Sequence, residues 1–512
     1  MSTKLSISIA VCFLALGSLA GAQTEKPNVV IILADDMGID SVAALNEKCG
    51  IATPNLDRLV AEGMAFTDAH SGSAVCSPTR YGVLTGRYSW RTRMKRGIVG
   101  QWQPPLIAEA RLTLPKMLRD NGYATACIGK WHLGWNWPKR GGGFTTRAAE
   151  IDYKAPIRGG PTSRGFDYYL GDDVPNWPPF VWIENDRALA EPTAKMKAGA
   201  MDGVSAGPAT PGWKFDAVLP RLAERCAEYV KAQAKTEKPF FLFFPMTSPH
   251  TPIAPSAEFR GKSKISDYAD FLMETDWAVG QVLRALEQSG QAGQTLVVFT
   301  GDNGTSPKCN FENLEQHKAH LREHWRGWKA DAFEGGHRVP FVVRWPGVVK
   351  PGSRCAEPIT LVDLTATMAG VVDYKLPPDA AEDSHSLLPY FRGQSPAEPL
   401  HEAVICHSIS GHFVVRRGKW KLLFCRGSGG WSPPREKDAA KLDLPPTQLY
   451  DLSVDPKERT NVVAKHPEVV KELTAILRRF VERGRSTPGP VQANTGGTSW
   501  PGLPWHGASG GR

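Results

Sequence analysis

Short, continuous apolar runs recur along most of the chain and alternate with amphipathic stretches. The first run, PNVVIILADDMG, is rich in β-branched residues over residues 29–33. Runs of this kind are typical of strands buried on both faces of a parallel sheet. We predict strands here and at four further runs: ATACIGK, KPFFLFFPM, TLVVFTGDNG and VPFVVRWPG.

The stretches between these strands have the signals of helices. In TPNLDRLVAEG, Thr53 stands at the N-cap position, Pro54 in the first turn and Gly63 at the stop, as helix ends favour. TLPKMLRDNGY repeats these signals, and residues 266–290 place apolar side chains along one side of a long helix. Strands that alternate with helices predict an α/β fold with a large, mostly parallel sheet flanked by helices.

The pattern changes after about residue 395. FVVRRGKWKLLF and QLYDLSVDPKERTNVV are typical of antiparallel hairpins, and a helix is expected near residues 467–483. We expect a large domain over residues 23–395 and a small α+β subdomain with an antiparallel sheet over residues 396–485. Residues 486–512 are rich in Gly, Pro and Ser, which predicts a flexible tail.

Residues 1–22 have the pattern of a signal peptide. One Lys precedes a short apolar run, and the run ends at Ala20-Gly21-Ala22, an A-x-A type cleavage site. The alternative is a membrane anchor, but the run is short for a membrane span. We expect cleavage after Ala22 and export of the mature chain as a periplasmic or secreted protein. No membrane anchor is expected after cleavage.

Net charge says little about binding partners, and cysteine content says little about disulfides. The formal charge of +9 becomes +8 once Lys4 leaves with the signal peptide, which favours anionic partners. No concentrated basic run of the kind expected for nucleic-acid binding occurs. Eight of the nine cysteines remain after cleavage, and a disulfide between Cys406 and Cys425 is conceivable in an exported chain.

Acidic and amide side chains follow two of the predicted strands. Asp35 and Asp36 end the first strand, and Asp302 and Asn303 follow the strand at residues 295–301. The carboxyl ends of parallel strands share one edge of the sheet, where ligands bind. Turn and cap positions also favour Asp and Asn, but two such clusters at one edge indicate an all-oxygen site for Ca²⁺ or Mg²⁺.

Cationic residues and histidines lie at comparable places. The candidates are Arg80, Lys130, His132, His250, Lys329 and Arg338. Each alone is more typical of a surface or structural residue. Together they describe a site for a tetrahedral anion, because fixed positive charges stabilise the charge that grows in the transition state.

Several sequence blocks resemble the sulfatases of the alkaline-phosphatase-like superfamily. CSPTR, at residues 76–80, matches the Cys-x-Pro-x-Arg signature, and ADDMG, GKWHLG, SPHTP, TGDNG and GWKADAFEGGHRVP match the other blocks in the family's order. The resemblance covers about residues 26–480 and is strongest to bacterial proteins similar to arylsulfatase A and N-acetylgalactosamine-6-sulfatase. It implies an alkaline-phosphatase-like fold, with residues 23–395 as the catalytic domain.

The resemblance also implies a modified nucleophile. In this family a maturation enzyme oxidises the signature Cys, here Cys76, to Cα-formylglycine. One hydroxyl of the aldehyde hydrate attacks sulfur, and the second lets the aldehyde re-form and expel sulfate. A plain serine would be trapped as its sulfate ester.

The remaining roles follow from the same motif matches. Ca²⁺, in preference to Mg²⁺, is held by Asp35, Asp36, Asp302, Asn303 and the hydrate oxygen of residue 76. Arg80 and Lys130 hold and polarise the hydrate. His132 is the base of the second step, while His250 and Lys329 bind sulfate oxygens and one of them protonates the leaving alcohol.

The substrate is less clearly indicated. Tryptophans at positions 131, 135, 137, 177 and 182 either pack in the core, as most tryptophans do, or stack on sugars. The candidates for binding sugar hydroxyls are Asp172, Asp173, His407 and His412. Family likeness suggests a sulfated carbohydrate, with 6-sulfated galactose or N-acetylgalactosamine units favoured. Two alternatives stay open: a phosphate or phosphonate mono- or diester hydrolase, and a lectin-like protein with an inactive site.

Overall fold

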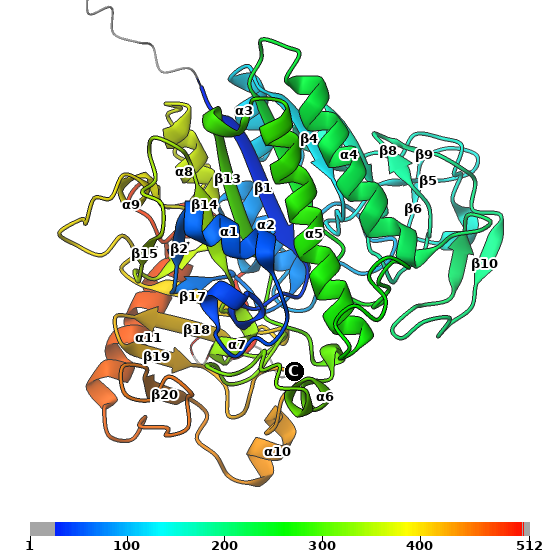
Figure 1. Cartoon of the computed structure of the whole chain (residues 1–512). Helices are drawn as coiled ribbons and strands as arrows, with labels where there is room; N and C mark the ends of the chain where they lie inside the picture. The colour runs from blue at the N-terminus through cyan, green and yellow to red at the C-terminus, as the bar shows by residue number, and fades with distance from the viewer. Residues whose placement is uncertain (1–25, 504, 506–512) are drawn as a thin grey trace, which may run out of the picture.

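The computed structural model describes residues 26–503 and 505, and the predicted signal peptide lies outside these residues. A ten-stranded sheet forms the centre (Figure 1). Its strands, in spatial order, are β15 (Ser353–Cys355), β2 (Met64–Phe66), β14 (Phe341–Arg344), β13 (Thr295–Gly301), β1 (Asn28–Ala34), β12 (Phe240–Pro245), β4 (Ala124–Ile128), β7 (Tyr168–Gly171), β8 (Ile183–Glu184) and β9 (Arg187–Ala188). The five strands from β13 to β7 are parallel, and the antiparallel pairs lie toward the two ends.

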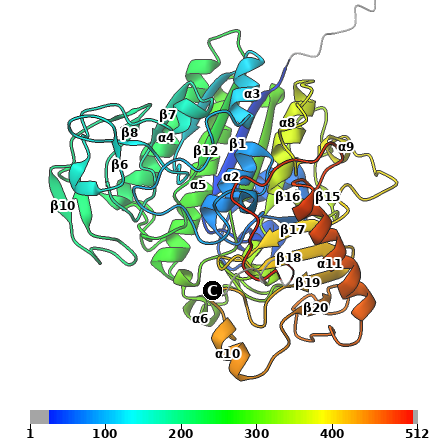
Figure 2. The ribbon, with the colours of Figure 1, turned by 180° about the vertical axis from the view of Figure 1, so that it is seen from behind.

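Helices cover both faces of this sheet, as the sequence predicts. Because side chains alternate along a strand, Val29 and Ile31 of β1 pack into the core on one face and Val30 and Ile32 into the core on the other. One face is covered by α1 (Pro54–Glu62), α4 (Val218–Gln233) and α5 (Asp267–Gln288), and the other by α2 (Cys76–Thr85), α3 (Leu114–Asp120) and α8 (Leu364–Val371) (Figures 1 and 2).

Three strands finish side by side at the predicted edge. The Met246 amide donates to Leu33 O and the Asp302 amide to Ala34 O, both at 2.9 Å, which joins the ends of β12 and β13 to the end of β1. The Lys130 amide donates to Pro245 O at 2.7 Å. The polar residues that follow these strands are therefore held next to one another by backbone hydrogen bonds.

A second, antiparallel sheet lies at the lower end of the central sheet in Figure 1. Its order is β17 (Val404–His407), β18 (Phe413–Arg417), β19 (Trp420–Leu423) and β20 (Gln448–Asp451), and α11 (Pro467–Glu482) packs against it. The shorter elements are β3 (Ala69–His70), β5 (Trp137–Pro138), β6 (Phe144–Thr145), β10 (Ala194–Met196), β11 (Gly207–Ala209), β16 (Ile359–Thr360), α6 (Phe311–Gln316), α7 (Glu334–His337), α9 (Leu388–Phe391) and α10 (Glu436–Lys441). The predicted small α+β unit is thus present.

A buried ionic network joins the two sheets. Lys421 Nζ of β19 lies 3.0 Å from Glu334 Oε1 of α7 and 2.8 Å from Glu458 Oε1. Arg338 Nη2 lies 2.6 Å from Glu334 Oε2, and the same guanidinium also contacts Asp68. Arg338, one of the candidate anion-binding cations, therefore belongs to this structural network rather than to the site described below.

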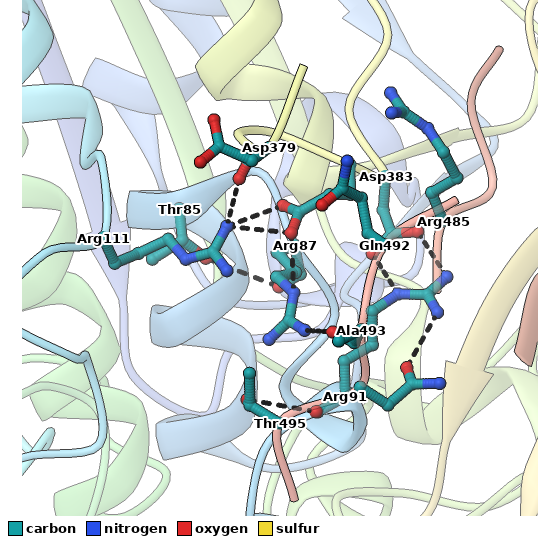
Figure 3. Close-up of polar contacts among 12 residues, drawn as sticks. Thr85, Arg87, Arg91, Arg111, Asp379, Asp383, Arg485, Gln492, Ala493 and Thr495 are labelled. Carbon is teal, nitrogen blue, oxygen red and sulfur yellow. Dashed lines mark hydrogen bonds and ion pairs between the residues drawn. The ribbon is translucent and has the colours of Figure 1, made fainter. Parts of the chain in front are cut away.

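Within residues 483–503, the chain packs against the large domain, whereas composition predicted a flexible tail from residue 486 onward. Arg87 Nη2 donates to Ala493 O at 2.8 Å, and the Thr495 amide donates to Arg91 O at 2.7 Å (Figure 3). Trp500 Nε1 donates to Trp90 O at 2.9 Å, and its indole is buried. Long-range hydrogen bonds of this kind leave no signal in local composition.

Two further expectations concern cysteines and membranes. Every cysteine within the described residues is a free thiol, so Cys406 and Cys425 form no disulfide. Over residues 26–503, no helix is both long and apolar enough to cross a membrane.

Candidate active site

The ends of β1 and β13 and the first turn of α2 bring the predicted metal ligands together. A carboxylate oxygen of Asp35, a carboxylate oxygen of Asp302 and the sulfur of Cys76 all lie within 4.8 Å of one another. Asn303 Nδ2 donates to Asp36 Oδ1 at 2.9 Å, and the Asp36 amide donates to Asp302 Oδ1 at 3.1 Å. All five side chains are buried.

The oxygens of this group fit a hard cation. Asp35 Oδ1 and Asn303 Oδ1 are fully buried and accept no hydrogen bond from any described residue. An unpartnered buried oxygen is costly, and the set offers carboxylate and amide oxygens, which Ca²⁺ and Mg²⁺ prefer. The donor set therefore fits the predicted cation.

Three cations surround the carboxylates. Lys130 Nζ lies 2.5 Å from Asp35 Oδ2, Arg80 Nη2 lies 2.8 Å from Asp302 Oδ2, and Lys329 Nζ lies 2.7 Å from Asp36 Oδ1. Arg80 is one helical turn after Cys76, so α2 presents both to the same place. Four elements and the loop that carries Lys329 thus converge on one small, highly charged volume.

Burial and neighbouring charge set the proton affinities of these groups. Burial alone would raise the pKa of Asp35, but Lys130, His250 and Arg80 outweigh it and hold that pKa well below its usual value. Burial and the charge of Asp35 raise the pKa of Asp302 to about 7. Burial also raises the pKa of the Cys76 thiol, so the unmodified cysteine is held as a poorly nucleophilic thiol.

His250 presents one ring nitrogen to the site. Its Nδ1 lies 2.5 Å from Thr251 O, which assigns the N–H to Nδ1, and its Nε2 lies 3.8 Å from Asp36 Oδ2. Burial and the charge of Lys329 lower the pKa of His250 to about 4. Burial opposes the charge of Lys329 itself, but Asp36 and Cys76 raise the pKa of Lys329 above its usual value.

His132 is held by a backbone carbonyl that the sequence did not reveal. Its Nε2 lies 3.0 Å from Val99 O, which fixes the proton on Nε2 of the neutral ring, and its Nδ1 is buried without a hydrogen-bond partner among the described residues. The Val99 amide in turn donates to Ser77 Oγ at 3.1 Å. A backbone carbonyl has no side-chain signature, so no sequence motif identifies Val99.

Burial, followed by the charges of Lys130 and Arg80, lowers the pKa of His132 well below its usual value. The backbone is also strained here, with positive φ at Asp36 (65°), His132 (53°), Asp173 (60°) and Ala330 (84°). Non-glycine residues keep such angles only where the surroundings enforce them, and these angles cluster at functional sites.

Most candidate sugar-binding residues have structural partners instead. Trp131, Trp135 and Trp137 are buried in the main core, so none of the three can stack on a sugar. The Trp182 indole packs against Trp213 with Arg221 over its ring. Trp177 alone of the five contacts a predicted catalytic residue, with its ring centre 5.4 Å from that of His132.

Three of the four polar candidates for sugar binding have hydrogen-bond partners within the protein, and Asp172 differs from them. His407 contacts Ser89 Oγ and Ser408 O, and His412 contacts Phe424 O. Asp173 Oδ1 accepts from the His132 amide at 3.0 Å, while both carboxylate oxygens of Asp172 are buried without a described partner. Burial and the neighbouring Asp173 raise the pKa of Asp172 to about 7.

Comparison with known proteins agrees with this arrangement. The sulfatase family model matches residues 27–374. The chain belongs to the sulfatase family. An N-acetylgalactosamine-6-O-sulfatase of Bacteroides thetaiotaomicron is 30% identical over 507 residues, which cover 90% of this chain and 94% of the relative.

Solved structures place the fold in the alkaline-phosphatase-like superfamily. One, from work on the metabolism of multiple glycosaminoglycans by Bacteroides thetaiotaomicron, has a TM-score of 0.76 and 29% identity, covering 89% of this chain and 99% of its own. A phosphonate monoester hydrolase of Agrobacterium radiobacter has a TM-score of 0.58 at 19% identity, covering 90% and 96%, and so shares the fold. This sulfatase is therefore a sulfuric ester hydrolase with an alkaline-phosphatase-like catalytic fold.

Proposed function

We propose that this sulfatase is exported and removes sulfate from a carbohydrate, with Cys76 converted to formylglycine and Ca²⁺ held by Asp35, Asp36, Asp302, Asn303 and residue 76. The observation that carries the proposal is the placement of the Cys76 side chain within 4.8 Å of the buried carboxylates of Asp35 and Asp302. The converted residue would supply a hydroxyl nucleophile for sulfur, and the cation would lower the pKa of that hydroxyl.

The other side chains are assigned by their positions. Arg80 and Lys130 contact the carboxylates around residue 76, and we assign them to hold and polarise its oxygens. Lys329 and His250 both lie next to the Asp36 carboxylate. There they bind sulfate oxygens, and one of them protonates the leaving alcohol.

His132 is assigned as the base of the second step. Its free Nδ1 carries the lone pair that such a base requires, because Nε2–H donates to Val99 O. A lowered pKa keeps the ring unprotonated at neutral pH. The imidazole is therefore available to accept a proton when sulfate is expelled.

The substrate class comes from the relatives. A sulfatase named for N-acetylgalactosamine 6-O-sulfate spans nearly the whole chain, so a carbohydrate sulfated at position 6 is the substrate we favour. The deciding experiment measures sulfate release from defined sulfated sugars beside an aryl sulfate and an aryl phosphate. Peptide mass spectrometry would establish conversion of Cys76, and Cys76→Ala would serve as the control.

Each outcome decides a part of the proposal. Sulfate released from one sugar class, and absent with Cys76→Ala, supports the reaction and identifies the substrate. Cleavage of the aryl phosphate by fully converted protein, with no sulfate released from any ester, would favour the phosphate or phosphonate hydrolase. Binding of a sulfated glycan without turnover of any ester would favour the lectin-like alternative.

A further inference from the structure

A large groove lies apart from the buried carboxylates, between the segment after α2 and the C-terminal segment. Its volume is about 950 Å³. Arg93, Lys95 and Arg96 line one side, and residues 499–503 line the other. The sulfatase mechanism described above uses none of these residues.

The groove is positively charged. No acidic side chain occurs among its lining residues, whereas three of them are cationic. Arg93 donates to Pro104 O and Pro105 O, and Lys95 donates to Gly497 O. These carbonyl acceptors orient the side chains without neutralising their charge, because a carbonyl carries no net charge.

Lys95 is the weakest of the three cations at neutral pH. Burial, followed by the charges of Arg87 and Arg91, lowers the pKa of Lys95 to about 7. Arg87 and Arg91 are themselves paired with Glu382 and Asp383. The uncompensated charge of the groove at neutral pH therefore lies mainly on Arg93 and Arg96, which favours an anionic ligand.

The aromatic side chains of the groove restrict the kind of anion. Phe424 and Trp500 are only 4% and 3% exposed, and Lys95 Nζ lies 3.8 Å from the centre of the Trp500 ring. Proteins that bind single-stranded nucleic acid present exposed aromatic faces on which bases stack. These buried rings offer no such face, so the groove suits a polyanionic glycan better than a nucleic acid.

The same segment forms part of the wall of the active site. Val99, three residues after Arg96, accepts the hydrogen bond from His132 at 3.0 Å. Because three residues of fully extended chain span about 11 Å, the Cα atoms of Arg96 and Val99 are no farther apart than that. The Gly97 amide donates to Ile409 O, and the Ile409 amide donates to Ala330 O beside Lys329. One chain segment thus separates the groove from the catalytic groups.

We infer that the groove lined by Arg93, Lys95 and Arg96 is an accessory subsite for sulfate or carboxylate groups on a more distant part of the glycan whose sulfate ester is cleaved. This inference rests on the proposed carbohydrate substrate. A polymer then gains contacts that a monosaccharide lacks, and the gain appears in its affinity rather than in the chemical step.

Binding is tested without turnover. Full-length Cys76→Ala protein is titrated with labelled dextran sulfate, neutral dextran and single-stranded DNA of matched charge. We expect dextran sulfate to bind, neutral dextran not to bind, and Arg96→Glu in the same background to weaken binding about 10-fold and flatten its salt dependence. Lys238→Glu, an exposed lysine before β12 at the opposite end of the sheet, is the matched charge reversal and should weaken binding less than about 2-fold.

Turnover then separates the groove from the catalytic site. With converted protein, Arg96→Glu should raise KM for a sulfated oligosaccharide several-fold and leave kcat/KM for a small aryl sulfate unchanged. Equal effects of Arg96→Glu and Lys238→Glu, or DNA binding as tight as that of dextran sulfate, would overturn the subsite. Failure of the proposed function is distinguishable, because it would abolish sulfate release from every ester while leaving the dextran sulfate titration interpretable.

Discussion

His132 Nε2 and Val99 O lie 3.0 Å apart, and this single hydrogen bond decides which nitrogen of the neutral imidazole carries the hydrogen. A carbonyl oxygen can only accept a hydrogen bond, so Nε2 carries the hydrogen and the lone pair of the neutral ring is on Nδ1. The structure therefore fixes the tautomer of His132, as hydrogen bonds to the second ring nitrogen do in other histidines.

Replacing His132 by Ala should slow the second half of the reaction more than the first. We expect the alcohol to appear in a burst of about one equivalent per enzyme, followed by turnover about 10²- to 10⁴-fold slower than that of the unmodified sequence. Rapid-mixing measurements with an aryl sulfate, with sulfate followed separately, would test this. Linear release of alcohol and sulfate at equal rates would contradict the assignment.

Ser77→Ala should weaken the positioning of His132 indirectly, through Val99. Ser77 Oγ accepts from the Val99 amide at 3.1 Å in a buried position, so the variant leaves that donor unpaired and frees the carbonyl that orients His132. We expect kcat to fall about 10-fold, since a misplaced catalytic group costs rate steeply, with little change in KM. Ser77→Thr keeps the hydroxyl and should restore most of kcat, provided that peptide mass shows equal conversion of Cys76 in all three proteins. A Thr variant as slow as the Ala variant would argue for a purely steric role.

Removal of the cation should lower both activity and stability. Asp35 Oδ1 and Asn303 Oδ1 are buried without a described hydrogen-bond donor, so chelation should leave the site under strain. We expect Ca²⁺ to raise the Tm of chelator-treated protein, because a ligand at 100 times its Kd stabilises by about 2.7 kcal/mol. Asp35→Asn should abolish this Ca²⁺-dependent rise. An equal rise in both proteins would place the cation elsewhere.

The sequence predicted that these polar side chains would lie close together, because parallel strands end at a common edge. Asp35, Lys130 and Asp302 each follow such a strand, and the edge brings them together whatever the details of packing. The family motifs supplied the order and the roles. These signals are local and survive without knowledge of the tertiary structure.

The failures have the opposite character. Trp131, Trp135 and Trp137 were candidates for stacking on sugars, yet they pack in the core, because burial depends on segments far away in the chain. Arg338 read as an anion-binding cation, yet Glu334 and Asp68 pair with it. The contacts of the C-terminal segment with Arg87 and Arg91 join residues about 400 positions apart, which composition does not encode.

At Gly304, next to the predicted metal ligands, the backbone packs closely against the segment that contains Gly335. A Cβ at this position would lie 1.7 Å from Gly335 O, and the residue directly follows Asn303. Gly304→Ala should therefore displace Asn303 and weaken the stabilisation by Ca²⁺, with a loss of about 1–3 kcal/mol from overpacking alone. Gly293→Ala is the matched control, because a Cβ there meets nothing within 4 Å. Urea unfolding with and without Ca²⁺ would compare them, and indistinguishable behaviour would contradict the argument.

Arg91 and Asp383 form a fully buried pair that joins the segment after α2 to the segment between α8 and α9 (Figure 3). Arg91 Nε and Nη2 each lie 2.7 Å from a carboxylate oxygen of Asp383. Burial would raise the pKa of Asp383, but Arg91 and backbone and hydroxyl donors outweigh it and lower that pKa. Because the folded pKa is below the unfolded value, the pair's contribution is fully present above about pH 4 and is lost as pH falls through the folded pKa.

Arg91→Met should accordingly destabilise the protein most near neutral pH. Leaving a buried carboxylate without its partner costs about 3–5 kcal/mol, whereas Arg479→Met, which removes an exposed pair with Glu402, should cost less than about 1 kcal/mol. Urea unfolding at pH 7 and pH 3 would measure both variants. The cost of Arg91→Met should shrink at pH 3, because Asp383 then gains a proton. A cost that is equal at both pH values would show that Arg91 stabilises through packing rather than through its charge.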